Sequence, residues 1–188
     1  MKTKKKPVQI VAILDMSGSM SPLQTEVINS FNYFIEEQKK LKGKAEVTLV
    51  LFDNYYEVPF EKINLKKFNP IDSTIYKPRG MTSLYDAIGK TVAKFEEYTD
   101  VVMMIQTDGE ENSSKEFTQE VIQKLLKQKE TDGWDISFLG ANIDAKQVGA
   151  SIGIALCKSV QYTNDSVGLA SAFAHANATS VNYRNSKL

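Results

Sequence analysis

The sequence is poor in the residues that most metal centres and hydrolases use, with one cysteine, Cys157, and one histidine, His175. A single cysteine excludes a disulfide within the chain and is typical of proteins kept in a reducing compartment. Its apolar neighbours, residues 154–157, predict a buried structural thiol. One histidine excludes a cluster of His ligands for zinc or copper, and we expect His175 to be packed or at the surface.

The sequence also lacks an excess of charge of one sign. Lys and Arg number 23 and Asp and Glu number 23, so the formal net charge is zero. A protein that binds nucleic acid through its phosphates carries a basic excess, so we expect no nucleic-acid partner. The one basic run predicts a solvated N-terminal tail over residues 1–6.

Long apolar stretches are absent as well. No run approaches the roughly 18 residues that a membrane span needs, and the first apolar run lacks the features of a secretory signal. We therefore expect no membrane partner and a cytoplasmic location. The length of 188 residues and the 42% hydrophobic content predict a single folded domain over residues 7–188.

Apolar runs alternate with helical patterns along the chain. The runs at 8–14, 45–52, 101–107 and 134–140 are nearly continuous, which is typical of parallel strands buried on both faces. Helices are predicted to begin near residues 21, 82, 113, 144 and 165, where capping residues precede apolar residues at helical spacing. A short strand is predicted at 159–163. The pair Asp53-Asn54 predicts a tight turn, after which residues 55–60 return as an antiparallel edge strand containing Pro59.

This order predicts an α/β fold with a doubly wound, Rossmann-like sheet. The sheet is expected to be mostly parallel, with one short antiparallel edge strand and helices on both faces. Residues 61–80 are expected to be irregular. In such sheets, ligands bind outside the carboxyl ends of the strands, where Asp15 and Asp108 are predicted to lie.

Three segments offer oxygen ligands at that edge. Asp15, Ser17 and Ser19 form an Asp-x-Ser-x-Ser pattern after the first strand, Thr82 precedes a helix, and Asp108 follows a later strand. Carboxylate and hydroxyl oxygens are suited to Mg²⁺, Mn²⁺ or Ca²⁺. Taken alone, the first pattern could merely cap a helix near Ser21, but the three segments in order indicate a metal site. Such an ion would accept an anionic oxygen from outside without any bond being broken.

These residues resemble those of a known family. The set Asp15-x-Ser17-x-Ser19, Gly80-Met81-Thr82-Ser83-Leu84 and Thr107-Asp108-Gly109 is similar to the metal-ion-dependent adhesion site of von Willebrand factor A domains. The resemblance covers roughly residues 7 to 180. It is strongest to small intracellular versions in bacteria and phages, including those of tellurium-resistance systems. It implies Ser17, Ser19 and Thr82 as direct ligands, with Asp15 and Asp108 acting directly or through water.

The resemblance also implies a function. It predicts a protein-binding module, not an enzyme, in which the bound ion coordinates an Asp or Glu carboxylate of a protein partner. Thr82 matches the ligand whose contact changes when a partner binds. The identity of the partner and the oligomeric state stay open.

Neighbouring residues carry smaller expectations. Asp86 is expected either to hydrogen-bond the site or to favour the helix dipole. Glu110 and Glu111 are expected to be solvated or to repel acidic partners. Gly109 is a further candidate, because it follows Asp108. Three more residues flank Thr82 and are expected either as exposed contacts at the rim of the site or in a loop that only covers the sheet edge: Tyr76, Arg79 and Met81.

Two alternative functions remain. In the first, Asp15 is the nucleophile of a metal-dependent phosphatase or phosphotransferase, similar to the haloacid-dehalogenase type. That family has an acid two residues later, where this chain has Ser17, a poor general acid. In the second, the chain is a self-assembling scaffold that uses an acid from a neighbouring copy.

Overall fold

The computed structural model describes residues 6–141 and 144–188. Its centre is a six-stranded sheet in the order β3-β2-β1-β4-β5-β6. All neighbouring strands are parallel except β2 and β3, which pair antiparallel at one edge. The strands are β1 (Val8–Asp15), β2 (Ala45–Phe52), β3 (Tyr56–Asn64), β4 (Val101–Thr107), β5 (Asp135–Ala141) and β6 (Ser159–Tyr162). The predicted fold class is confirmed.

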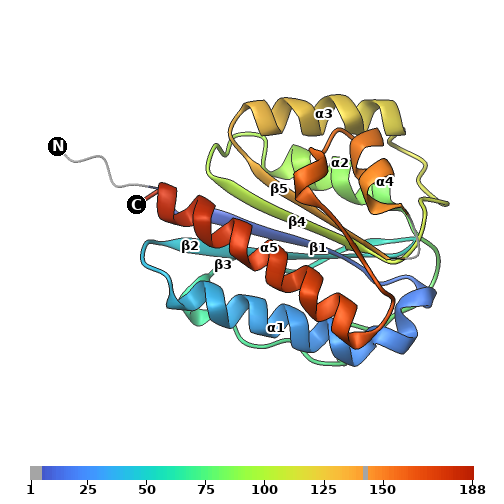
Figure 1. Ribbon diagram of the computed structural model, residues 1–188, viewed down its shortest axis with the longest axis horizontal. Coiled ribbons are helices and arrows are strands. Elements are labelled where there is room, and N and C mark those ends of the chain that lie inside the picture. Colours follow the sequence, from blue (N-terminus) through green and yellow to red (C-terminus); the bar gives the residue numbers. More distant parts are fainter. Residues whose placement is uncertain (1–5, 142–143) are drawn as a thin grey trace.

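Helices cover both faces of the sheet. Figure 1 shows α1 and α5 on one face and α2, α3 and α4 on the other. The α-helices are α1 (Gln24–Lys40), α2 (Leu84–Lys94), α3 (Gln119–Thr131), α4 (Ala145–Ser151) and α5 (Ser166–Ser186). Short 3-10 helices lie at η1 (Gly18–Leu23), η2 (Leu65–Lys67) and η3 (Leu156–Lys158).

Two apolar cores result from the alternation of side chains along the strands. Ile10, Ala12 and Leu14 of β1 belong to the core under α1 and α5. Val11 and Ile13 of the same strand belong to the core under α2 and α3. Because β1 is central and buried on both faces, its end is held in place from both sides.

Several helix starts differ from the sequence prediction. Residues 18–23 form a 3-10 helix containing Pro22, so the α-helix starts at Gln24 and not near Ser21. Ser113 does not begin a helix, because Ser113 and Ser114 donate their backbone N–H to Glu111 and α3 starts only after Thr118. Asp144 and Asp165 do cap α4 and α5, as predicted.

Two further expectations are corrected. Cys157 is exposed and not buried, because it lies in the short helix η3 at the surface while Ile154 alone of that apolar run enters the core. The segment predicted to be irregular contains the end of β3, up to Asn64, and η2. Of the predicted N-terminal tail, residues 1–5 lie outside the described residues and Lys6 is exposed. None of the described helices combines the length and apolarity needed to cross a membrane.

Candidate metal site

Two carboxylates meet at one edge of the sheet. Asp15 is the last residue of β1, and Asp108 directly follows Thr107, the last residue of β4. The two strands are parallel neighbours, so their carboxyl ends lie together. Both side chains are buried, with Asp15 fully inaccessible and Asp108 2% exposed.

Hydroxyl groups connect these carboxylates. The backbone N–H of Ser17 donates to Asp15 Oδ1 at 2.7 Å, which folds the loop back over the strand end. The Ser17 and Ser19 hydroxyl oxygens lie 3.0 Å apart, and Ser19 Oγ donates to Asp108 Oδ1 at 2.6 Å. Four of the five predicted ligands therefore form one continuous polar cluster.

The segment that carries Thr82 is bonded to the same loop. Gly18 donates its backbone N–H to the carbonyl of Gly80 at 3.1 Å. Gly80 has a φ of 68°, and a Cβ there would lie 2.4 Å from Asn54 Oδ1, so glycine is required. The Thr82 hydroxyl lies 3.7 Å from the place that a Cβ on Gly109 would take. Thr82 is thus beside the loop of the second carboxylate.

The electrostatics of the cluster favour a cation. Burial raises the pKa of Asp15 to about 6, although hydrogen bonds from Thr107 and Ser17 oppose this. Burial also raises the pKa of Asp108, and its Oδ2 atom is buried with no hydrogen-bond partner among the described residues. In residues 6–141 and 144–188, no Lys, Arg or His forms an ion pair with either carboxylate.

The donor set fits a hard divalent ion. Three segments that contact one another supply two carboxylates and three hydroxyls. The carboxylates belong to Asp15 and Asp108, and the hydroxyls to Ser17, Ser19 and Thr82. No group of three or more His, Cys, Asp or Glu side chains is placed to hold a metal among the described residues. An ion at this edge would therefore depend on hydroxyl ligands as much as on carboxylates.

Tyr76 and Thr107 support the cluster from within the protein. Tyr76 is fully buried, so the expectation of an exposed contact at the rim is wrong. Its hydroxyl donates to the backbone carbonyl of Asp15 at 2.5 Å. Thr107 donates its hydroxyl to Asp15 Oδ2 at 2.6 Å, a contact that the sequence analysis missed. The only sequence signal for it is that Thr107 precedes Asp108 at the strand end.

The loop after β4 is tied to the start of α2. Asp86 accepts hydrogen bonds from the backbone N–H groups of Lys115, Glu116 and Phe117 at 2.9 Å each. Burial opposes ionisation of Asp86, but these amides outweigh it and lower its pKa. Asp86 therefore holds the loop and makes no described contact with the candidate ligands, which corrects the expectation of a hydrogen bond to the site.

Glu111 and Asn112 complete this connection. Glu111 accepts from the backbone N–H of Tyr85 at 2.9 Å and from Ser113 and Ser114, so it is not a freely solvated acid. Asn112 Oδ1 accepts from the N–H of Thr82 at 3.0 Å, and its own N–H donates to the Thr82 carbonyl at 3.0 Å. The sequence gives no signal for Asn112, because it meets Thr82 only through the fold.

Exposed residues border the cluster on the side of the β2–β3 turn. The Arg79 side chain is 51% exposed, donates to Asp53 Oδ2 at 2.8 Å and also pairs with Glu57. Met81 is 50% exposed, and its backbone N–H is held by Asn54 Oδ1 at 2.8 Å. On the other side Glu110 is exposed, next to Gly109.

Among known proteins, similarity is found to solved structures and not to family models or curated sequences. A scan against protein-family models finds no match, and a search of the curated proteins finds none. A von Willebrand factor type A protein from Catenulispora acidiphila has a TM-score of 0.65 and 16% identity, and the match covers 93% of this chain and 43% of that one. The chain has the fold of a von Willebrand factor A domain.

Two other structures with this von Willebrand factor A fold hold metal ions. Proximal thread matrix protein 1 from the mussel byssus, with a zinc-occupied metal-ion-dependent adhesion site, has a TM-score of 0.65 and 15% identity over 93% of this chain and 48% of that one. Manganese-loaded TRAP protein from Plasmodium vivax has a TM-score of 0.60 and 17% identity, and the match covers 89% of this chain and 73% of that one. The chain spans less than half the length of the first two of these three structures.

Proposed function

We propose that this chain is a divalent-metal-dependent protein-binding module and not an enzyme. The observation that carries the proposal is the buried pair Asp15 and Asp108, linked through serine hydroxyls and left without a basic partner in the described residues. Two buried carboxylates repel each other and lose hydration, so a cation between them would remove both costs. The orphaned Asp108 Oδ2 is an atom available for this.

Each predicted ligand has a role in this proposal. Ser17, Ser19 and Thr82 would contact the ion through their hydroxyl oxygens, while Asp15 and Asp108 supply the balancing charge directly or through water. A bound ion, Mg²⁺ or alternatively Mn²⁺ or Ca²⁺, would supply a Lewis-acidic position for an anionic oxygen from outside. The neighbours that hold zinc and manganese support divalent binding in this fold.

The proposed partner is a protein that presents an Asp or Glu carboxylate. Exposed Arg79 and Met81 lie on one side of the cluster and Glu110 on the other. Aromatic residues, Arg and Met are enriched where proteins meet, so this rim would set partner choice. We also propose a cytoplasmic location and a relation to the small intracellular domains of tellurium-resistance systems.

The contacts of Asp15 argue against the phosphotransfer alternative. A nucleophilic carboxylate needs an accessible oxygen, but Oδ1 accepts from Ser17 N–H, Oδ2 accepts from Thr107, and the side chain is inaccessible. Ser17 stands where a general acid would be required. No comparable observation favours the self-assembling scaffold.

Calorimetric titration of the metal-free chain with Mg²⁺, Mn²⁺ and Ca²⁺ tests the metal site. Asp108→Asn keeps the size of the side chain and removes its charge, and Asp132→Asn makes the same change at an exposed position after α3. We expect binding in the wild type and in Asp132→Asn and at least a tenfold loss in Asp108→Asn, since a charged ligand is lost. Equal affinity in all three would refute the site.

Affinity capture from host extract tests the binding function. The wild-type chain is compared with Asp15→Ala in Mg²⁺ and in EDTA, and candidate partners are then re-expressed with single Asp or Glu positions changed to Asn or Gln. The proposal requires a partner that is retained only by the wild type in Mg²⁺ and is lost with one acidic residue. Retention that is indifferent to metal and to Asp15 would contradict it.

A further inference from the structure

A basic cavity lies at the opposite end of the sheet from the metal site. It has a volume of about 280 Å³, near the lower end of small-molecule sites, which span about 300–1,000 Å³. Val8, the first residue of β1, lines it, whereas Asp15 at the far end of that strand belongs to the metal cluster. The two sites are therefore separated by the length of the central strand.

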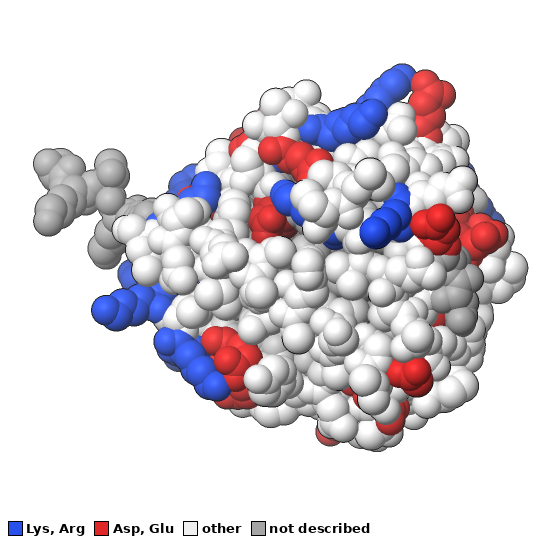
Figure 2. All heavy atoms as spheres, viewed as in Figure 1, with Lys and Arg blue, Asp and Glu red and all other residues white. Residues whose placement is uncertain are grey.

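The charge of this cavity stands out in a chain whose net charge is zero. Five of the eight lining residues have basic side chains and none has an acidic side chain; the basic ones are Lys6, Lys42, Lys44, Arg184 and Lys187. Only Lys187 has an ion-pair partner in the part of the chain that the structure describes, Asp100 at 2.7 Å. Figure 2 shows Lys and Arg side chains, with some Asp and Glu among them, at the edge of the molecule where α5 ends.

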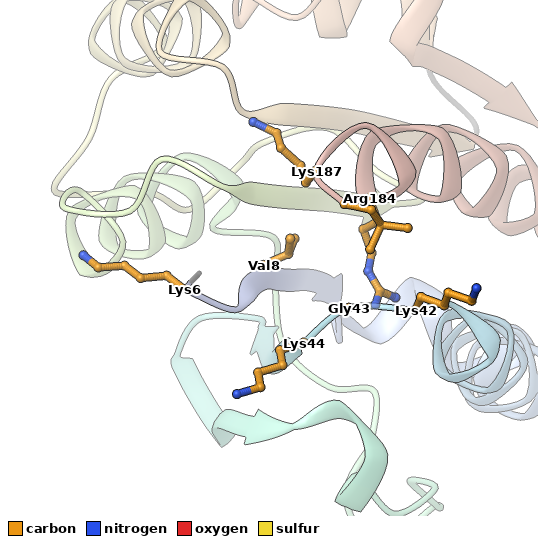
Figure 3. A pocket seen from close by; sticks show the side chains of 8 residues that line it. Lys6, Val8, Lys42, Gly43, Lys44, Arg184 and Lys187 are labelled. Atoms are coloured by element: carbon orange, nitrogen blue, oxygen red, sulfur yellow. The ribbon is translucent and has the colours of Figure 1, made fainter. Parts of the chain in front are cut away.

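Arg184 gives the cavity a fixed, buried donor. It is 2% exposed, and its Nη1 donates to the Gln38 backbone carbonyl at 2.7 Å and to Gln38 Oε1 at 3.0 Å. The other terminal nitrogen, Nη2, is buried and has no hydrogen-bond partner among the described residues. Figure 3 shows the side chain extending from α5 toward Gly43. An unpaired guanidinium nitrogen held in this way is ready for an anionic oxygen.

The remaining wall is apolar. Val8 and Leu188 line the cavity, together with Gly43, and the Leu188 side chain packs so closely that a Cβ on Gly43 would lie 2.9 Å from it. The lysines contribute the methylene groups of their side chains, and Figure 3 shows them spread around the rim. An inorganic anion alone would leave this apolar surface unused.

We propose that this cavity binds a small amphipathic anion, an acidic group joined to a short apolar chain or ring. The acidic group pairs with Arg184 Nη2, and the apolar part covers Val8 and Leu188. Lys42 and Lys44, whose ammonium groups point away from Arg184 in Figure 3, turn toward the acidic group when it binds. This site is separate from the metal site and does not depend on the function proposed for it.

The test uses hexyl phosphate as the probe, in EDTA, so that no anion binds through a metal. The ¹⁵N-labelled full chain is titrated and followed by the amide signals of Gly43 and Lys44. Inorganic phosphate and hexanol, which carry one half of the probe each, are titrated separately. We expect saturable shifts at Gly43 and Lys44 with hexyl phosphate and at least tenfold weaker binding of each half.

Variants test the assigned residues. Lys42→Ala with Lys44→Ala changes two exposed residues, so we expect the fold to be kept, and Arg184→Gln removes the buried donor. Each is expected to weaken hexyl phosphate binding about tenfold or more, because charged hydrogen bonds are lost. Lys146→Ala, at an exposed position of α4, is the control and should bind as the wild type does. If Arg184→Gln does not fold, since it also loses its contact to Gln38, the double lysine variant decides the matter.

Three results would overturn the proposal. Hexyl phosphate shifts at the amides of residues 15–19 and 108–112, and not at those of the cavity, would place its binding site at the metal edge. Inorganic phosphate binding as tightly as hexyl phosphate would remove the apolar half of the assignment. If the double lysine variant bound hexyl phosphate as tightly as the wild type, the lysines would have no part in binding. Arg184 would then have only a structural role, through its hydrogen bonds to Gln38 in α1.

Discussion

The hydroxyl of Tyr76 donates to the backbone carbonyl of Asp15 at 2.5 Å, directly beneath the candidate metal cluster. The two residues are far apart in sequence, and Tyr76 is fully buried. This bond holds the end of β1 through its backbone and does not use the side-chain oxygens of Asp15, which accept hydrogen bonds from Ser17 and Thr107. The irregular segment before Thr82 thus contributes to the floor of the site as well as to its rim.

We predict that Asp15→Asn stabilises the metal-free protein. Burial raises the pKa of Asp15 from 3.8 to about 6, so ionising it at pH 7.5 costs up to ~3 kcal/mol in the folded state. Asparagine removes that cost and can still accept from Ser17 N–H. Urea unfolding in EDTA should show a higher free energy of unfolding for the variant, whereas Mg²⁺ should stabilise only the wild type. A variant less stable than the wild type in EDTA would contradict this.

The raised pKa of Asp15 also predicts that the free energy of unfolding depends on pH. The folded pKa is higher than the unfolded one, so the contribution of Asp15 to stability is fully present below pH 3.8 and is lost as pH rises to about 6. The difference in unfolding free energy between Asp15→Asn and the wild type, measured in EDTA, should therefore grow across this window and then level off. A difference that does not change with pH would mean that Asp15 titrates normally.

Tyr76→Phe should lower the free energy of unfolding by about 1–2 kcal/mol, because the buried carbonyl of Asp15 loses its hydroxyl donor. Tyr33→Phe is the matched control, since Tyr33 is 61% exposed and should change little. Equal urea midpoints for Tyr76→Phe and the wild type would show that the bond contributes nothing.

Asp86→Ala should loosen the loop after β4. Three backbone N–H groups, of Lys115, Glu116 and Phe117, lose their acceptor, so their amide hydrogens should exchange at least tenfold faster. Glu97→Ala removes an exposed acid after α2 and should leave these three amides unchanged. Unchanged exchange in Asp86→Ala would assign the order of this loop to other contacts, such as those of Glu111.

Thr82→Ala should weaken partner binding more than it weakens metal binding, in line with the role that the resemblance gives this threonine. Thr82→Ser keeps the hydroxyl and is expected to retain most of both. Calorimetry with Mg²⁺ and capture of the partner in Mg²⁺ provide the two measurements. Parallel losses of metal and partner in Thr82→Ala would count against a separate role for the hydroxyl.

The sequence predicts those features of the site that depend on where strands end and on short motifs. Asp15 and Asp108 follow apolar runs, and the parallel arrangement brings such ends together, so the structure gathers them as expected. Asn112 and Thr107 could not be assigned roles, because their bonds to Thr82 and Asp15 exist only after the chain folds. The capping pattern at Ser113 failed for a similar reason, since Glu111 takes up the nearby backbone N–H groups.

Exposure was the harder property to predict. Cys157 was expected in the core and is exposed, and of the two expectations for Tyr76 the exposed rim contact is wrong. Local composition does not tell which side of a short irregular segment faces the sheet. The basic cavity likewise combines residues from the chain ends and from the loop after α1, which no local pattern connects.

Lys6 and Leu188 line the same cavity, at the end of the sheet away from Asp15 and Asp108 (Figure 1). Tethering the chain through either of these residues to a sensor surface or a carrier would therefore orient the metal edge outward, toward the solution. Forms immobilised in this way should thus remain usable reagents for finding the partner.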